Sequence, residues 1–190
     1  QQWLPRLAPG LPLPIPAPLR TGRPDAAYPY VWSILPWIQG EAADLAPPDA
    51  SEAPVLANFL RAVHQPAPAD APKNPVRDCP LSAKQADTER RMETLRRDTD
   101  AITPSIESIW ARALAAPIDL PRTWIAGDVH ARNVLVRNGK LAAFIDWGDI
   151  CAGDAATDLA SIWSLFDAAP ARQAATKAYG MSQATVARAM

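Results

Sequence analysis

Three polar residues, Asp128, Asn133 and Asp146, have types and a spacing that suit phosphate chemistry. A carboxylate and an amide oxygen are hard ligands for Mg²⁺, which keeps several waters and shares its coordination with substrate phosphates. A second carboxylate that the metal does not need can accept a proton from an attacking hydroxyl group. An Asp, an Asn five residues later and a further Asp after a hairpin are the groups that phosphoryl transfer requires. These residues are therefore the first candidates for an active site.

The segment that must bring these residues together is predicted to be a β-hairpin. Two short apolar runs flank Asn138-Gly139, and this dipeptide between such runs is the strongest short-range hairpin signal. A two-residue turn would place Asn133 opposite Phe144 at the open end of the hairpin, from which Asp146 also emerges. The three candidate groups could then converge, although each alone could also be a simple turn or strand-end residue.

Further acidic residues follow the hairpin. Residues 141–171 contain five Asp and no Lys or Arg, which gives a local negative field that suits a metal ion and a cationic substrate. Two of the five, Asp154 and Asp158, could instead favour the start of a helix through its dipole. His130 could orient the loop, contact a phosphate or be structural. His64, at the end of an amphipathic helix, is expected to be structural.

Composition limits the classes of function. The 190 residues suffice for one sizeable domain or two small lobes, and 48% of them are hydrophobic, as in globular proteins. A net charge of -1 offers no general field for nucleic acid or an anionic membrane. An apolar start that prolines interrupt is neither a signal peptide nor a membrane span. Two cysteines make no disulfide framework, which favours a cytoplasmic location, and the acids around Cys151 disfavour its thiolate.

Proline-rich connections separate the other predicted elements. Residues 12–20 and 30–38 are expected to form a hairpin, but the first cannot be a central strand because its prolines lack ladder donors. A lobe boundary is placed in the connector 39–49, and the Pro-rich stretch 65–80 is predicted to be a loop. The absence of an initial Met and a helix-like end together suggest a fragment.

Helices are predicted where apolar side chains recur with helical spacing. They cover 51–65, 82–98 and 103–115, a segment after 154, and a segment that Gly180 would cap. The basic cluster of the second helix is read as a solvated face, because acids alternate with its arginines. Thr103, before Pro104, is expected to cap the third of these helices. The residues expected to be buried are Leu56, Phe59, Leu60 and Val63 in the first helix, Ile106, Ile109, Trp110 and Leu114 in the third, and Leu159, Ile162, Trp163 and Phe166 in the helix after residue 154.

The motifs GDVHARNVLV (127–136) and FIDWGDICAGDAATDLA (144–160) resemble the catalytic loop and the metal loop of the aminoglycoside phosphotransferase family. Residues 11–41 resemble the last strands of the N-terminal lobe and the hinge of that family. The resemblance implies an α+β, protein-kinase-like fold. Residues 1–40 would form a partial N-terminal lobe with a β-hairpin and the hinge. Residues 41–190 would form a mainly helical C-terminal lobe with the catalytic hairpin.

The resemblance also implies roles for individual residues. Asp128 would be the catalytic base, and Asn133 and Asp146 would hold Mg²⁺. The implied activity is the transfer of the γ-phosphoryl group of ATP to a hydroxyl of a small molecule, with no nucleic-acid or membrane partner. The residues that would support the catalytic loop are His130 and Asp158, and those of the nucleotide hinge are Leu35, Trp37 and Ile38.

The sequence departs from the family pattern in ways that leave two alternatives. Ala126 stands where a His is usual, no Gly-rich phosphate loop is present, and no Lys precedes the hinge. A non-catalytic, kinase-like fragment that lacks the nucleotide-phosphate lobe is therefore the first alternative, and this chain alone is expected to bind ATP weakly. The second is a metallophosphoesterase, because GDVH resembles part of its signature. Such two-metal sites need more histidines than the two in this chain.

Overall fold

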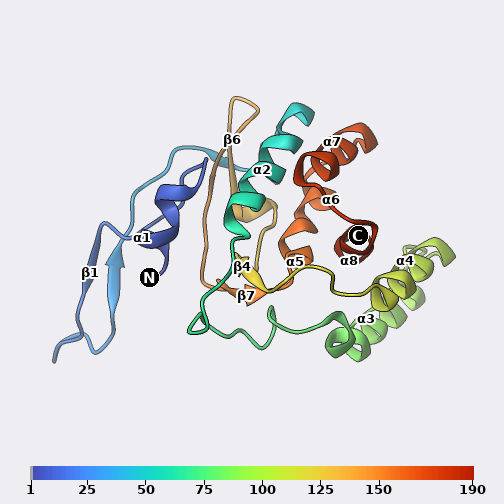
Figure 1. Ribbon diagram of the computed structural model, residues 1–190, viewed down its shortest axis with the longest axis horizontal. Helices are drawn as coiled ribbons and strands as arrows, with labels where there is room; N and C mark the ends of the chain where they lie inside the picture. The colour runs from blue at the N-terminus through green and yellow to red at the C-terminus, as the bar shows by residue number, and fades with distance from the viewer. Residues whose placement is uncertain (1) are drawn as a thin grey trace.

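The computed structural model describes residues 2–190 and combines three small antiparallel sheets with helices (Figure 1). The sheets pair β1 with β2, β3 with β5 and β6, and β4 with β7. The strands are β1 (Arg20–Gly22), β2 (Trp32–Ile34), β3 (Glu41–Ala42), β4 (Thr123–Ile125), β5 (Val134–Arg137), β6 (Lys140–Phe144) and β7 (Cys151–Gly153). The α+β class expected from the sequence is confirmed.

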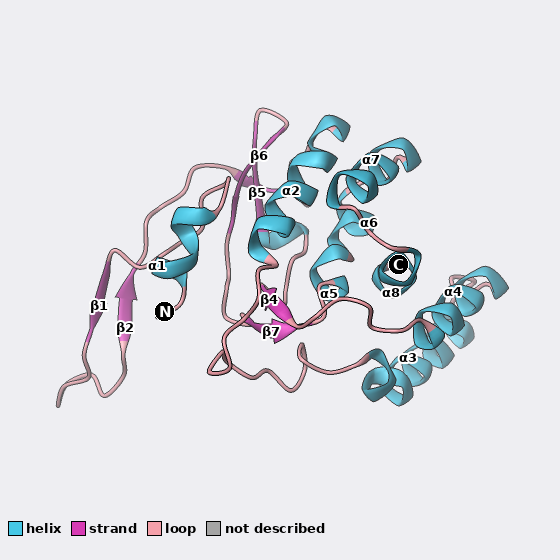
Figure 2. Cartoon of the chain, in the orientation of Figure 1, coloured by secondary structure: helices cyan, strands magenta, loops and turns pink. Residues whose placement is uncertain are grey.

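Most of the helices gather on one side of the strands (Figure 2). They are α1 (Leu4–Leu7), α2 (Ala53–Val63), α3 (Gln85–Asp98), α4 (Pro104–Ala115), α5 (Ala156–Leu159), α6 (Ser161–Leu165), α7 (Ala169–Tyr179) and α8 (Gln183–Ala189). Short 3₁₀ turns cover Ala8–Gly10, Ala50–Glu52, Leu81–Lys84 and Ala131–Asn133. Among residues 2–190, no helix has the length and apolar character that crossing a membrane requires.

The N-terminal segment contributes to the main core although prolines interrupt it. Trp3, Leu4 and Ile15 are buried, and the Trp3 ring centroid lies 5.0 Å from that of Trp124. The helix α1 was not expected from the sequence. Pro5 stands in its first turn, where a missing N–H leaves no bond unmade.

The predicted N-terminal hairpin is present but shorter than expected. β1 begins at Arg20, which pairs with Ile34, so the Pro-rich residues 12–18 stay outside the ladder. Gly22 pairs with Trp32, and a Cβ at Gly22 would lie 1.9 Å from the Trp32 ring. Only Trp32–Ile34 of the aromatic run 30–38 form a strand, because the partner strand β1 also has only three residues.

The central hairpin carries a correction to the predicted register. Asn138 and Gly139 have φ values of 53° and 73°, as a two-residue turn of the predicted type requires. A β-bulge between Leu135 and Val136 then shifts the pairing, so that Val134 and not Asn133 lies opposite Phe144. Asn133 therefore ends a 3₁₀ turn that precedes β5, one residue outside the ladder.

The core forms where α2 packs against the hairpin and α7. The predicted stripe of α2 is confirmed, because Leu56, Phe59, Leu60 and Val63 are all buried. The rings of Phe59 and Phe144 stack with centroids 3.9 Å apart. This stacking fixes α2 against the strand that leads to Asp146.

The pair α3 and α4 lies at one edge of the molecule (Figure 1). Thr103 caps α4 by accepting a hydrogen bond from the N–H of Ile106, as its position before Pro104 predicted. The predicted buried stripe of α4 is wrong: Ala113 is its buried residue and Ile106 is 40% exposed. An edge helix has no neighbour on most of its surface, so Ile109, Trp110 and Leu114 are only partly buried. The arginines of α3 are exposed, as predicted.

The last helices follow the predicted pattern with one interruption. The helix expected after residue 154 is divided into α5 and α6. Of the apolar face expected there, Leu159, Ile162 and Phe166 are buried, whereas Trp163 is only partly buried. Gly180 ends α7 in the left-handed conformation, with φ of 79°.

Candidate active site

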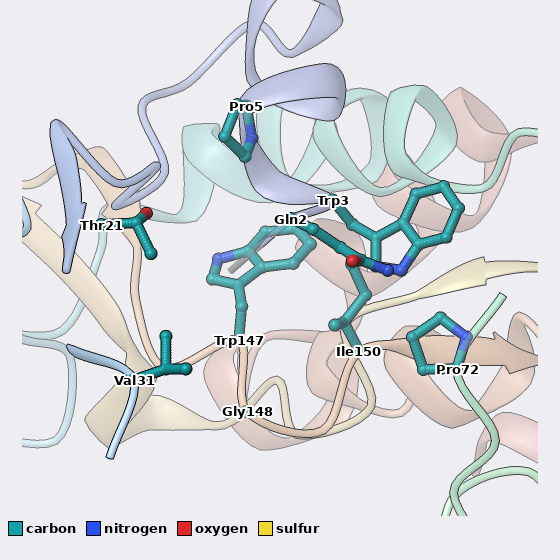
Figure 3. Close-up of a pocket in the computed structure, with 9 residues that line it drawn as sticks. All are labelled: Gln2, Trp3, Pro5, Thr21, Val31, Pro72, Trp147, Gly148 and Ile150. Carbon is teal, nitrogen blue, oxygen red and sulfur yellow. The ribbon is translucent and has the colours of Figure 1, made fainter. Parts of the chain in front are cut away.

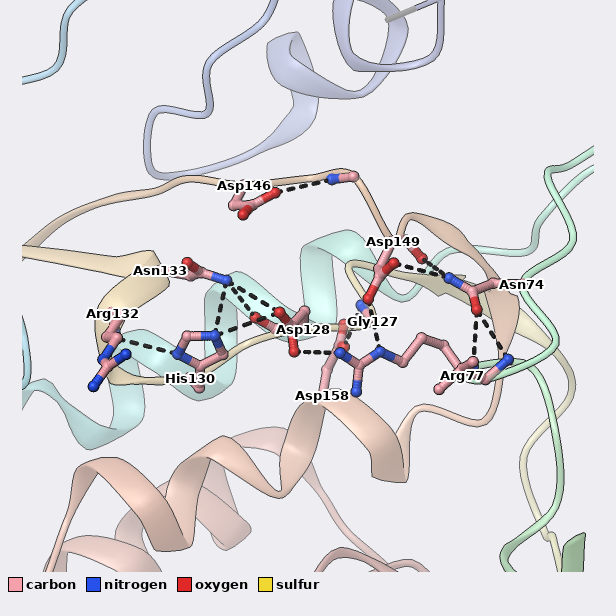
Figure 4. Close-up of polar contacts among 12 residues, drawn as sticks. Asn74, Arg77, Gly127, Asp128, His130, Arg132, Asn133, Asp146, Asp149 and Asp158 are labelled. Atoms are coloured by element: carbon pink, nitrogen blue, oxygen red, sulfur yellow. Dashed lines mark hydrogen bonds and ion pairs between the residues drawn. The ribbon is translucent and has the colours of Figure 1, made fainter. Parts of the chain in front are cut away.

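The loop between β4 and β5 brings Asp128, His130 and Asn133 into one hydrogen-bonded cluster (Figure 4). The side-chain amide of Asn133 donates to the backbone oxygen of Asp128 at 3.0 Å and lies 3.4 Å from its carboxylate. The Nε2 atom of His130 lies 3.4 Å from the same carboxylate. The structure thus groups three of the residues that the sequence singled out.

Asp158 holds this loop from the side of the helices. Its carboxylate accepts hydrogen bonds from the backbone N–H groups of Ala126, at 2.7 Å, and Gly127, at 2.8 Å. The side chain of Asp158 is fully buried in α5, so the two N–H groups replace the water that it has lost. Ala126 stands where the family usually has His, and it contributes its backbone N–H. Any residue other than proline could provide this group.

The buried His64 completes the support behind Asp158. Its Nε2 atom lies 3.2 Å from the Asp158 carboxylate, and its Nδ1 atom lies 2.8 Å from the hydroxyl of Tyr179. Burial, together with Asp158 and Asp154, raises the pKa of the Tyr179 hydroxyl to about 12. The prediction that His64 is structural is therefore confirmed. The contacts from Tyr179 to His64 and from His64 to Asp158 link α7, α2 and α5 to the loop.

Asp146 emerges just beyond β6, next to the cluster but not bonded to it. The N–H of Ile145 donates to the backbone oxygen of Asn133 at 2.8 Å, which ties the two segments together. Asp146 has a left-handed backbone with φ of 57°, and its exposed carboxylate accepts one long hydrogen bond, from Gly148 at 3.4 Å. Its oxygens are largely free.

The donor set fits Mg²⁺ better than a metal that needs a full protein cage. The amide nitrogen of Asn133 faces Asp128 and His130, which leaves its oxygen turned away from them (Figure 4). Residues 2–190 contain no group of three or more His, Cys, Asp or Glu side chains placed to hold a metal ion. A pair of oxygen ligands, from Asn133 and Asp146, suits a cation that keeps waters and phosphate oxygens.

The Pro-rich loop before α3 contributes residues that the sequence did not indicate. The guanidinium of Arg77 lies 2.5 Å from the Asp128 carboxylate and 2.8 Å from that of Asp149. Asn74 donates to Asp149 at 3.1 Å. The hydrogen bonds from Arg77 and Asn74 hold the pKa of Asp149 below its usual value. No periodicity or motif marks this loop, so only its three-dimensional placement could have revealed these contacts.

The predicted hinge residues line a pocket of about 370 Å³ that reaches Asp146. Leu35, Trp37 and Ile38 form one wall, and Leu135 and Ile145 of the central hairpin belong to the same lining. The lining of the pocket is thus mainly apolar, with Asp146 as its one acid.

A larger cavity, of about 730 Å³, lies between the N-terminal segment and the loop after Asp146 (Figure 3). Its lining contains Trp3, Val31, Trp147 and Ile150 but none of the candidate acids. The side chains that could do chemistry therefore lie outside this cavity.

The acidic run after the hairpin is more varied than its sequence suggests. Asp154 pairs with the buried Arg188 at 2.7 Å. Burial, together with Asp78, Asp158 and Asp149, raises the pKa of the Cys151 thiol to about 11, so the expected resistance to thiolate formation is confirmed.

The comparisons with known proteins agree with this geometry. No curated protein matches the chain at a significant level. The chain is similar to the macrolide 2′-phosphotransferase MphH from Brachybacterium faecium, with 16% identity, a TM-score of 0.61, and coverage of 99% of this chain and 66% of that one. It is also similar to ADP-bound aminoglycoside phosphotransferase APH(2″)-Ib, with 18% identity, a TM-score of 0.61, and coverage of 98% and 66%.

A third similar structure is the ternary complex of APH(2″)-IIa with streptomycin and ATP, with 19% identity, a TM-score of 0.61, and coverage of 98% and 66%. The chain spans about two thirds of the length of these structures. At these identities the likeness shows the fold, which is the protein-kinase-like one that the sequence predicted. The model of the phosphotransferase enzyme family matches residues 1–189, and the chain belongs to that family.

Proposed function

We propose that this chain carries the catalytic lobe of an ATP- and Mg²⁺-dependent phosphotransferase, which transfers the γ-phosphoryl group to a hydroxyl of a small molecule. The observation that carries the proposal is the cluster of Asp128, His130 and Asn133 on a loop that Asp158 fixes by two backbone hydrogen bonds. A loop fixed in this way holds a base and a metal ligand in constant relative positions, which is the main requirement of phosphoryl transfer.

In this proposal Asp128 accepts the proton of the attacking hydroxyl. Each carboxylate oxygen has two lone pairs, so the bonds from Arg77, Asn133 and His130 leave acceptor capacity for a hydroxyl. Its side chain is 31% exposed, so an acceptor can reach it. His130 and Asp158 act as supports, the first by contacting the carboxylate and the second by holding the loop backbone.

Asn133 and Asp146 are the proposed ligands of Mg²⁺, which when bound would neutralise charge on the phosphates of the nucleotide. The 370 Å³ pocket supports a place for the base of the nucleotide, because it joins the hinge residues Leu35, Trp37 and Ile38 to Asp146. The apolar side chains of this lining suit a flat base, and its one acid suits a metal ion bound to phosphates. Macrolide and aminoglycoside phosphotransferases of similar fold make antibiotics one class of acceptor to test.

The division into two lobes is part of the proposal. Residues 1–40 would be the part of the N-terminal lobe that ends at the hinge, and residues 41–190 the catalytic lobe. The exposed β1–β2 hairpin and the position of β3 in the sheet of the central hairpin support a boundary near residue 40. Trp3 and Ile15 belong to the same hydrophobic core as the second part. The two proposed lobes therefore share one core and do not have separate ones.

A non-catalytic role is the second candidate. All four lysines, at positions 73, 84, 140 and 177, follow the hinge, so residues 1–40 contain no lysine that could contact the phosphates of a nucleotide. A protein of this kind would keep the fold without turnover. The two candidates differ in whether ATP is consumed.

The test is a screen for ATP consumption in the presence of Mg²⁺ and a panel of hydroxyl compounds, which includes aminoglycosides, macrolides, sugars and amino alcohols. Turnover with one class, lowered on the order of 10²- to 10⁴-fold in Asp128→Asn, is expected from the loss of a positioned base. Asp167→Asn, an exposed acid outside the cluster, is the matched control and should keep wild-type turnover. Circular dichroism checks that both variants fold. Turnover that Asp128→Asn leaves intact would refute the assignment, and no turnover with any acceptor would favour the non-catalytic role.

A further inference from the structure

A short strap of the Pro-rich loop, residues 74–78, lies against the candidate active site (Figure 4). Its Arg77 reaches both Asp128 and Asp149, although these carboxylates are 51 and 72 positions away in sequence. The Arg77 side chain is 27% exposed, which places a guanidinium group at the mouth of the site and not in the core.

All four oxygens of these two carboxylates have a donor from this chain. Arg77 donates to Oδ1 of Asp128 and to Oδ2 of Asp149. Asn74 donates to Oδ1 of Asp149, and Oδ2 of Asp128 faces Asn133 and His130. An incoming ammonium group would compete with the guanidinium for these oxygens and be repelled by its charge, whereas an uncharged hydroxyl needs only one remaining lone pair.

Several contacts hold the strap in this position. The side-chain oxygen of Asn74 accepts hydrogen bonds from the N–H groups of Val76 and Arg77, at 3.0 and 3.1 Å. Asp78 pairs with Arg122 at 2.5 Å. Gly127 leaves room for the strap, because a Cβ at that position would lie 3.2 Å from Cγ of Arg77. The guanidinium is therefore presented by a folded segment.

The neighbouring acids are also compensated from within the chain. Asp154 pairs with Arg188, and Asp158 accepts from two backbone N–H groups. Within the described part of residues 141–171, the acids without an ion pair are Asp146 and Asp167. The negative field that the sequence suggested for a cationic substrate is thus partly compensated by Arg77 and Arg188, and Asp146 is reserved by the proposed metal.

We propose that Arg77 determines acceptor specificity by occupying the cation position between Asp128 and Asp149, so that the acceptor is a hydroxyl compound without an amine near its reacting group. This inference rests on the proposed function, because it assumes that the site phosphorylates a small-molecule acceptor. It names uncharged alcohols and sugars as the preferred class and excludes polyamines and polyaminated sugars. A charged amine beside Arg77 would be repelled by the guanidinium, which weakens its attraction to the two carboxylates.

The experiment measures spermidine binding by calorimetry at low salt, without nucleotide, so it does not depend on turnover. Arg77→Met keeps the packing over Gly127 and removes the charge, and Arg77→Gln provides a second variant if the first does not fold. Spermidine should bind at least about tenfold more tightly to these variants than to the wild type, because the carboxylate pair becomes available. Arg132→Gln is the matched control, since it removes an exposed arginine paired with Asp44, and it should bind like the wild type.

One result would overturn the inference: folded Arg77 variants that bind spermidine no more tightly than the wild type does, including the case in which nothing binds. Turnover of the wild type with a polyaminated acceptor in the ATP screen would refute the specificity assignment while supporting the proposed function. A gain in spermidine binding by the Arg77 variants, without turnover of any acceptor, would support the role of Arg77 and count against the proposed function.

Discussion

The Nε2 atom of His64 lies 3.2 Å from a carboxylate oxygen of Asp158, and neither side chain is more than 1% exposed. His64 comes from the end of α2, and Asp158 comes from α5 and holds the loop that carries Asp128. The packing of α2 is therefore connected to the candidate active site through one contact between buried polar groups. Such contacts are costly to leave incomplete.

Replacing His64 with Ala is expected to lower the free energy of unfolding by about 1–3 kcal/mol. The change removes a partner from the buried Asp158 and from the hydroxyl of Tyr179, while the backbone bonds of Asp158 remain. Urea titration followed by circular dichroism measures the effect. His130→Ala is the control, because that side chain is 43% exposed, and its cost should stay below about 1 kcal/mol. Equal costs for the two variants would contradict this account.

Replacing Gly127 with Ala is expected to destabilise the protein by about 1–3 kcal/mol. Its φ is 85°, a region that side chains rarely adopt, and a Cβ would lie 2.7 Å from the backbone oxygen of Asp149. Gly10→Ala is a matched control, because no atom lies within 4 Å of its added Cβ. Thermal unfolding of both variants measures the difference. A Gly127→Ala variant as stable as Gly10→Ala would show that the loop adapts to the side chain.

The two cysteines should differ in their reaction with a thiol reagent. Cys151 is buried, and its pKa of about 11 leaves roughly one thiol in a thousand ionised at pH 8. Cys79 is half-buried in the Pro-rich loop and serves as the internal reference. Mass spectrometry of the protein after iodoacetamide treatment should find Cys79 labelled first and Cys151 only in denaturant. Labelling of both at one rate in the folded protein would argue against the burial.

Asp119 should give the protein an acid-sensitive contribution to stability. The hydroxyl of Ser182, followed by Thr185 and Arg188, lowers the pKa of Asp119 to about 2. Because the folded protein binds the ionised form better, the contribution is complete above about pH 4 and is lost as the pH falls toward 2. Unfolding measured between pH 5 and pH 2.5 should show a smaller pH-dependent loss in Asp119→Asn than in the wild type. The same loss in both would exclude this carboxylate as its source, and Asp167→Asn should follow the wild type.

The sequence predicted the parts of the fold that depend on local patterns. The turn at Asn138-Gly139, the cap at Thr103 and the end of α7 at Gly180 each need a specific backbone geometry, which leaves a clear mark on residue type. The buried stripe of α2 was predictable for the same reason. The stripe of α4 was not, because burial depends on which neighbour covers the helix, and spacing alone does not contain that information.

Two features of the site required the structure. The bulge after Leu135 adds a residue to one strand only, so a register counted from the turn places Asn133 one position too far into the ladder. The contact of Arg77 with Asp128 joins segments 51 positions apart through a loop without periodicity. The grouping of Asp128, His130 and Asn133 was predictable because the three lie within six residues of one another in sequence.

The left-handed backbone of Asp146 has a consequence for protein engineering. A redesign that chose each residue only for its backbone conformational preference would place Gly here, because a φ of 57° favours glycine. That exchange would count as stabilising, yet it would delete the carboxylate in the lining of the hinge pocket. Engineering for thermal stability should therefore leave Asp146 unchanged, because any stability gained at this position would cost the carboxylate proposed to hold the metal.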